Sequence, residues 1–141
     1  MNMIRHTALL LLGILVITTV EARTMNSLSD LQWQNRIILV GNPESKGEAI
    51  EALNRFRDGI EERDIAWFVV DEESVESNIN GLTAALSESV RARLNEGQTE
   101  VILIGKDGGV KDRGRQLDMD HLFSLIDSMP MRIREMKQQK D

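Results

Sequence analysis

A run of four apolar residues, Val101 to Ile104, leads directly into a glycine-rich turn. This segment limits the number of folds that the chain can adopt. The turn, residues 105–109, reads Gly-Lys-Asp-Gly-Gly, and its Asp107 and Gly108 both tolerate a positive φ, which predicts a type I′ hairpin. Because the apolar run does not alternate with polar residues, we expect both of its faces to be covered. The segment therefore predicts an inner strand of a layered α/β domain that reverses at a hairpin.

The first half of the chain predicts a β-α-β unit. Two continuous apolar runs, residues 37–40 and 65–70, have the composition of buried strands. Between them we expect a helix that begins either at Asn42-Pro43 or at Ser45, whose spacing to Glu48 is that of a capping box. A helix between two buried strands is typical of a right-handed crossover. We therefore expect the two strands to pair in parallel.

The second half predicts two further helices around the hairpin. Residues 74–81 are expected to form a loop, and a helix follows over 82–94, where leucine or valine recurs every four positions. Asp118 is expected to cap a long last helix, which Pro130 either bends or divides. The expected buried stripe of that helix consists of Leu122, Leu125, Ile126, Met129, Ile133 and Met136. The order β-α-β-α-β-β-α, with helices on both faces of a mixed sheet, predicts a thioredoxin-like α/β fold.

Composition excludes several kinds of chemistry. The chain contains no cysteine, so it cannot perform thiol redox reactions or build a zinc-thiolate site. Oxidoreductases of this fold carry a reactive cysteine just after the first strand, where this chain has residues 42–45, and a proline before the third strand, where it has Gln98-Thr-Glu100. His121 and the acidic run 71–73 fit structural or surface roles better than metal ligation. We therefore predict no catalytic residue, no metal and no cofactor.

The net charge and the N-terminal pattern predict a cellular context. The formal net charge of −6 argues against a nucleic acid partner, because phosphate backbones are bound by clustered basic residues. Arg5 followed by the apolar residues 8–20 is typical of a secretory signal peptide, with cleavage expected after Ala22. The apolar run is shorter than the roughly 20 residues that span a bilayer, so we expect no stable membrane insertion after cleavage. The predicted location is periplasmic or secreted, and the predicted organisation is a signal peptide (1–22), a polar lead-in (23–30), one thioredoxin-like domain (31–137) and a C-terminal tail (138–141).

Three motifs together resemble a known domain. They are Trp33 with Asn35-Arg36, the segment 103–111, and the segment 126–132 with Glu135-Met136. In this combination they resemble the P-DUDES-type domain of unknown function, which is found in exported bacterial proteins and in extracellular animal proteins such as Equarin and the sushi-repeat proteins. The resemblance extends from about Leu28 to Met136. It implies a thioredoxin-like fold and an extracytoplasmic location, and it supplies no established activity and no catalytic residues.

Two short basic segments are the remaining clue to function. Residues 105–115 and residues 130–141 each hold four basic and two acidic residues in an otherwise acidic chain. If the segments adjoin, they form an electropositive surface on which the lysine side chains are expected to be exposed. If the two segments lie apart, they are only a hairpin turn and the end of a helix, where basic side chains interact favourably with the helix dipole. The candidate partner-binding residues are Lys106, Asp107, Lys111, Met131 and Arg132.

The leading hypothesis is a non-enzymatic module that binds an unidentified protein or envelope component through the hairpin and the last helix. The alternative is an enzyme with cysteine-free chemistry on a small anionic ligand. A deep pocket lined by Lys106, Asp127 or Arg132 would favour the enzyme, whereas a shallow face with an exposed Met131 would favour binding.

Overall fold

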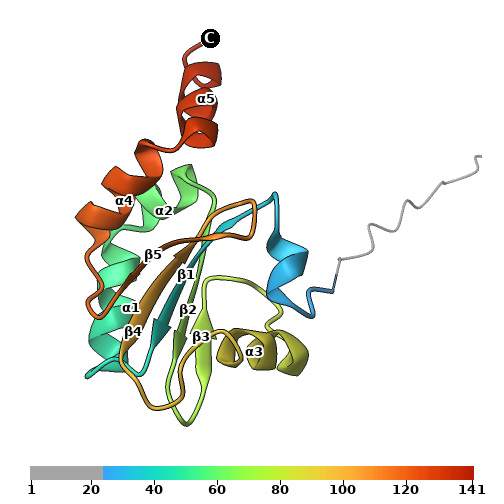
Figure 1. The fold of residues 1–141 in the computed structure, drawn as a ribbon, viewed down its shortest axis with the longest axis vertical. Coiled ribbons are helices and arrows are strands. Elements are labelled where there is room, and N and C mark those ends of the chain that lie inside the picture. Colours follow the sequence, from blue (N-terminus) through green and yellow to red (C-terminus); the bar gives the residue numbers. More distant parts are fainter. Residues whose placement is uncertain (1–23) are drawn as a thin grey trace, which may run out of the picture.

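A mixed five-stranded sheet forms the centre of the molecule, in the order β3-β2-β1-β4-β5 (Figure 1). The computed structural model describes residues 24–141, so the predicted signal peptide lies outside the described residues. The strands are β1 (Arg36–Gly41), β2 (Ile65–Val70), β3 (Val75–Ser77), β4 (Glu100–Ile104) and β5 (Val110–Gly114). The helices are the 3-10 helix η1 (Leu28–Leu31) and the α-helices α1 (Lys46–Arg55), α2 (Arg57–Glu62), α3 (Ala84–Arg91), α4 (Met119–Asp127) and α5 (Pro130–Gln138).

The strand pairing agrees with the sequence. β1 runs parallel to β2 and antiparallel to β4, and β4 forms the predicted hairpin with β5. In the shared register Ile38 of β1 lies between Trp67 of β2 and Leu103 of β4. β1, β2 and β4 are buried along their whole length, because helices cover both faces of the sheet. The predictions of inner strands and of parallel pairing are confirmed.

The sheet separates two apolar cores. Successive strand residues point to opposite faces, so Ile38 and Val40 pack with α1, α2 and α4, while Ile37 and Leu39 pack with η1 and α3. Figure 1 shows these two groups of helices on opposite sides of the sheet. The polar lead-in belongs to the second core, because Leu28 of η1 is buried there.

An edge strand replaces part of the predicted loop. β3 lies within residues 74–81 and pairs antiparallel with the outer edge of β2, so the prediction of an unstructured loop there is wrong. Asn78 continues the pairing with its side chain, which accepts a hydrogen bond from the Trp67 amide at 2.8 Å and donates to the Ile65 carbonyl at 3.0 Å. Only three residues form the strand, too few for an alternating pattern to be visible in the sequence.

The hairpin turn is wider than predicted. The Gly108 amide donates to the Gly105 carbonyl at 3.0 Å, and the Gly105 amide donates to the Gly109 carbonyl at 2.9 Å. Gly108 has φ 82°, but Asp107 does not have a positive φ, so the type I′ turn is wrong. Asp107 instead accepts a bond from the Gly109 amide with its side chain, which fixes the wider loop.

The helix ends confirm some expectations and correct one. The Ser45 and Asp118 side chains cap α1 and α4, and Pro130 is at the start of α5, so the last helix restarts there. The predicted apolar stripe does not continue into α5. Ile133 is 37% exposed, and the buried residue of α5 is instead Arg132.

Candidate functional site

The hairpin and the last helix, which carry the candidate residues, meet at one end of the molecule. α5 projects beyond the sheet at the end where the β4–β5 hairpin turns (Figure 1). The two elements are joined by Lys106, whose Nζ lies 2.8 Å from Oε1 of Glu135. Asp107 and Lys111 form a separate exposed pair on the hairpin, with 2.8 Å between Nζ and Oδ2. The sequence left open whether the two basic segments adjoin, and the ion pair between Lys106 and Glu135 brings them together.

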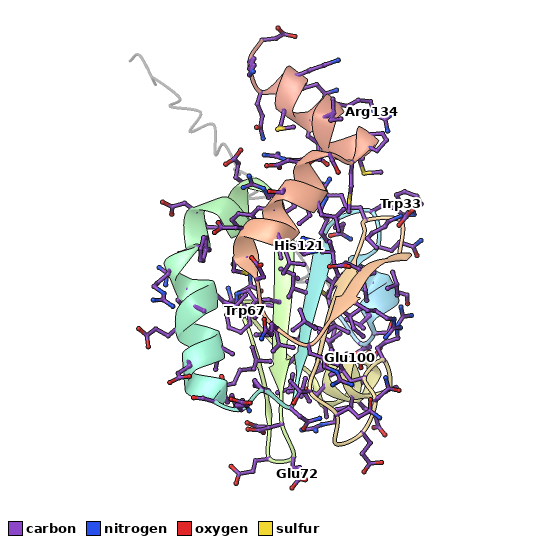
Figure 2. All side chains as sticks on the ribbon, turned by 60° about the vertical axis from the view of Figure 1, so that its left-hand side comes forward. Trp33, Trp67, Glu72, Glu100, His121 and Arg134 are labelled. Atoms are coloured by element: carbon purple, nitrogen blue, oxygen red, sulfur yellow. The ribbon has the colours of Figure 1, made fainter. Side chains whose placement is uncertain are left out.

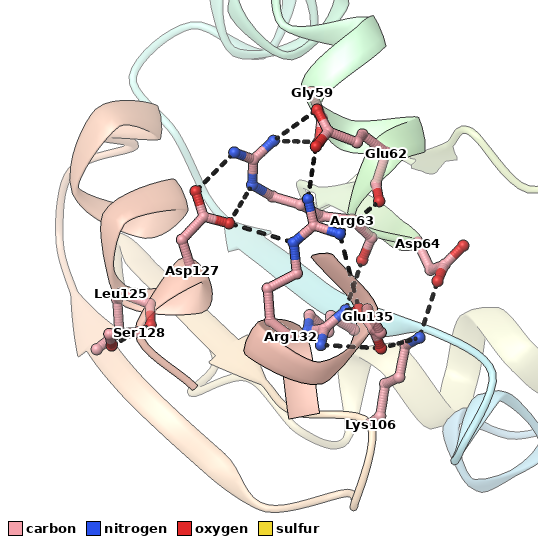
Figure 3. A network of polar contacts seen from close by, with 11 residues as sticks. Gly59, Glu62, Arg63, Asp64, Lys106, Leu125, Asp127, Ser128, Arg132 and Glu135 are labelled. Atoms are coloured by element: carbon pink, nitrogen blue, oxygen red, sulfur yellow. Dashed lines mark hydrogen bonds and ion pairs between the residues drawn. The ribbon is translucent and has the colours of Figure 1, made fainter. Parts of the chain in front are cut away.

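Glu135 holds α5 against the start of β1 and the hairpin. Its carboxylate accepts from both terminal nitrogens of Arg36, at 3.1 and 3.3 Å, as well as from Lys106 (Figure 3). Lys106 also contacts Oδ2 of Asp64 at 2.8 Å. The side chain of Arg36 is only 2% exposed and that of Lys106 only 10%. The prediction that the Lys106 side chain is exposed is therefore wrong.

Arg132 is the second link between α5 and the body of the domain. Its guanidinium is fully buried and donates to the side chain of Glu62 at 2.6 Å, to the Glu62 carbonyl at 3.1 Å and to Asp127 at 3.3 Å. Asp127 accepts two further bonds from Arg63, at 3.0 and 2.7 Å (Figure 3). Arg63 in turn lies over the ring of Phe123, with 4.2 Å to the ring centroid. Arg132 thus fastens α5 from inside and is not available to a partner.

This ion-pair network is neutral as a whole. It contains four cations and four anions: Arg36, Arg63, Lys106 and Arg132 with Glu62, Asp64, Asp127 and Glu135. Burial favours the neutral carboxyl form, but the bonds from Lys106 and Arg36 outweigh it and hold the pKa of Glu135 below its usual range. The pKa of Asp127 is lowered in the same way, against burial, by Arg63 and Arg132. A balanced network of this kind positions α5 and leaves no net charge for a ligand.

Trp33 is the residue at this end that sequence reasoning did not single out as a candidate. Its side chain is 64% exposed, and its backbone has φ 68°, a conformation that bulky residues rarely adopt. The hairpin holds it there, because the Trp33 amide donates to the Lys106 carbonyl at 2.6 Å and the Gln32 side chain donates to the Asp107 carbonyl at 2.8 Å. Figure 2 shows Trp33 at the same end of the molecule as Arg134 of α5. A tryptophan flanked by Gln32 and Gln34 is the signal that could have identified it.

In oxidoreductases of this fold the redox centre lies just after the first strand, and in this protein hydrogen bonds engage the residues at that position. After β1, the Asn42 side chain donates to the Gln98 carbonyl at 3.2 Å, and the Thr99 hydroxyl donates to the Asn42 carbonyl at 2.9 Å. These bonds tie the segment before α1 to the segment before β4. Ser45 is engaged as the cap of α1 through the Glu48 amide. Neither segment presents a nucleophile with an adjacent base.

Among the hollows on the surface of the described residues are three that are not lined by Lys106, Asp127 or Arg132. The one between β5 and α4 contains His121, whose Nε2 lies 2.8 Å from Oδ2 of Asp112. Within residues 24–141, no group of three or more His, Asp or Glu side chains is arranged to hold a metal ion. No helix in the same range is both long and apolar enough to cross a membrane. Lys106, Asp127 and Arg132, the residues named for the enzyme alternative, are instead engaged in the ion-pair network.

Comparison with known proteins defines the class. The chain belongs to a family described as a domain of unknown function, DUF4174, whose model matches residues 27–135. Among solved structures it is similar to the crystal structure of the reduced 2-Cys peroxiredoxin of Plasmodium vivax. That similarity has a TM-score of 0.50 and 16% sequence identity, and it covers 79% of this chain and 84% of the other. It confirms the thioredoxin-like fold. No curated protein matches the chain.

Proposed function

We propose that this protein is an exported thioredoxin-like module without redox cysteines that binds a macromolecular partner or an envelope component. The proposed binding site is the hairpin–α5 surface, defined as Trp33, Asp107, Lys111, Met131 and Arg134. The observation that carries the proposal is the exposed Trp33 in a left-handed backbone conformation. Such a conformation costs about 1 to 3 kcal/mol, and it places a large aromatic side chain in solvent instead of in a core. Tryptophan is the residue type most enriched among binding hot spots.

The ion-pair network supports this surface from below. Glu135 and Arg132 fix the rotation of α5, because they point from it into the domain. Met131 is one helical turn before Glu135, so it lies on the side of α5 that meets the hairpin, and Arg134 directly precedes Glu135 in the chain. Arg134 is exposed and has no ion-pair partner among the described residues, which leaves its charge available. Lys106 and Arg132 therefore act as positioning residues, while the contact residues are Trp33, Met131 and Arg134.

The same proposal includes the finer family placement and the location. Membership of the P-DUDES group, with Equarin and the sushi-repeat proteins, is supported by the motifs that resemble it. Arg36, Lys106 and Glu135, one from each motif, meet in the ion-pair network. Export is supported by the N-terminal pattern of the sequence. Export is tested by the mass of the protein recovered from the extracytoplasmic fraction, where we expect Arg23 or a close neighbour as the first residue.

Affinity capture from the native compartment tests the binding function. Tagged wild-type protein, the Trp33→Ala variant and an Ile133→Ala control are compared by quantitative mass spectrometry of the captured material. Ile133 is also an exposed apolar residue, but it lies outside the hairpin–α5 surface. We expect a specific partner with the wild type and the control, and its loss by at least tenfold with Trp33→Ala. Equal capture by all three proteins would remove Trp33 from the binding site.

A further inference from the structure

A second site lies under η1, on the side of the hairpin that faces α3. It is a hollow of about 220 Å³ lined by Leu28, Ser29, Gln32, Asn35, Ile37, Arg93, Ile104, Gly105, Asp107 and Gly108. Its volume is below the range that holds drug-sized ligands, so it suits a smaller molecule. None of the candidate contact residues on α5 takes part in it. The hollow shares Asp107 with the hairpin–α5 surface, but the inference drawn from it uses none of Trp33, Met131 and Arg134 and does not rest on the proposed function.

Three kinds of group in this lining are available to a ligand, whereas the Asp107 carboxylate is already bound by Lys111 and the Gly109 amide. The side chains of Leu28, Ile37 and Ile104 supply an apolar floor that belongs to the core between the sheet and η1. Arg93 supplies a guanidinium for which no hydrogen bond or ion pair occurs within residues 24–141. A free guanidinium beside an apolar floor is suited to a carboxylate attached to an apolar group.

The third kind of group is the side-chain amide. Gln32 uses its nitrogen to bind the Asp107 carbonyl at 2.8 Å, and Asn35 uses its nitrogen to bind the Asp64 carbonyl at 3.3 Å. In each of the two side-chain amides, the nitrogen is therefore already hydrogen-bonded within the protein. The oxygen of each amide accepts no hydrogen bond from residues 24–141 and remains an acceptor. Acceptors of this kind are suited to an ammonium group.

We propose that the hollow under η1 binds a free α-amino acid with an apolar side chain. The ligand carboxylate pairs with Arg93, its ammonium group donates to Gln32 and Asn35, and its side chain rests on the apolar floor. All three groups of the ligand then have a partner of matching chemistry in one hollow.

Titration of the protein with leucine, followed by nuclear magnetic resonance of backbone amides, tests this inference. We expect saturable shifts at Gly105 and Gly108, which line the hollow, with a dissociation constant in the millimolar range or below. Three probes each lack one group: leucinamide has no carboxylate, 4-methylpentanoate has no ammonium, and glycine has no side chain. Each is expected to bind about tenfold or more weakly than leucine. Equal binding of any one of them overturns the proposal, as does the absence of saturable shifts with leucine.

A matched pair of variants locates the site. Arg93→Gln should weaken leucine binding by about tenfold or more, because it removes the charge-assisted bonds to the carboxylate. Arg115→Gln is the control, since Arg115 is another exposed arginine without a partner in residues 24–141 and lines the hollow between β5 and α4. Unchanged binding by Arg93→Gln, or loss with Arg115→Gln in its place, would contradict the assignment.

Discussion

Replacement of Glu135 by glutamine should release α5 from the domain. Glu135→Gln keeps the shape of the side chain but removes the charge opposite Arg36, whose side chain is 2% exposed. Breaking a buried ion pair from one side costs about 3 to 5 kcal/mol. The cost here should be lower, because Glu135 is 22% exposed and Arg36 retains its bond to the Arg63 carbonyl at 2.9 Å. We therefore expect a loss of about 2 to 3 kcal/mol in the free energy of unfolding.

Urea unfolding and thermal melting measure this loss. For a domain of this size, 2 to 3 kcal/mol corresponds to a decrease in Tm of about 6 to 15 °C. Lys111→Gln is the control, because it removes an exposed i,i+4 pair with Asp107 and should cost less than about 0.5 kcal/mol. A double-mutant cycle of Glu135→Gln with Arg36→Met should give a coupling of about 0.5 to 3 kcal/mol. If Glu135→Gln is as stable as Lys111→Gln, the ion-pair network does not hold α5.

Three further predictions follow from particular residues. The pKa values of Asp127 and Glu135 are lower in the folded protein than in the unfolded chain, where they are about 4 to 4.5. The two carboxylates therefore contribute their full share to the free energy of unfolding above that pH range. This contribution is lost as the pH falls through the lower pKa values of the folded protein. Urea unfolding should therefore show falling stability below about pH 4.5, with a smaller fall in Glu135→Gln, and a flat profile down to pH 3 would disprove this role. Trp33→Gly should be more stable than Trp33→Ala by about 1 kcal/mol in thermal melts, since only glycine adopts φ 68° without strain; the reverse order would show that the backbone there is not strained. Gly108→Val should cost about 1 to 3 kcal/mol, because φ at Gly108 is 82° and the Gln32 amide lies 3.3 Å from the position of an added Cβ; a melt identical to the wild type would contradict the turn geometry.

Local patterns were sufficient for most of the fold. The apolar runs of β1, β2 and β4 are continuous because both faces of these strands are buried, and that property can be read from each segment alone. The caps Ser45 and Asp118 act on amides three residues away, so their role is also local. The turn type was missed because Asp107 hydrogen-bonds to the Gly109 amide instead of adopting a positive φ.

The candidate site depended on contacts between distant residues. Arg132 was counted with the candidate partner-binding residues, yet its guanidinium binds Glu62, which is 70 positions away in the chain. Glu135 and Arg36 are 99 positions apart. Helical periodicity places Ile133 and Met136 in a core, but the ion pairs turn another side of α5 inward. No local pattern shows which charges neutralise one another, so the sequence could not decide whether the two basic segments form one charged surface.

Site-specific photo-crosslinking in the native compartment tests the binding surface most directly. A benzoylphenylalanine is placed at position 33 in one variant and at the exposed position of Glu51 in α1 in another. The predicted result is a defined crosslinked adduct from position 33 and none from position 51. No adduct at position 33, or the same adducts at both positions, would contradict the claim that the hairpin–α5 surface binds a specific partner.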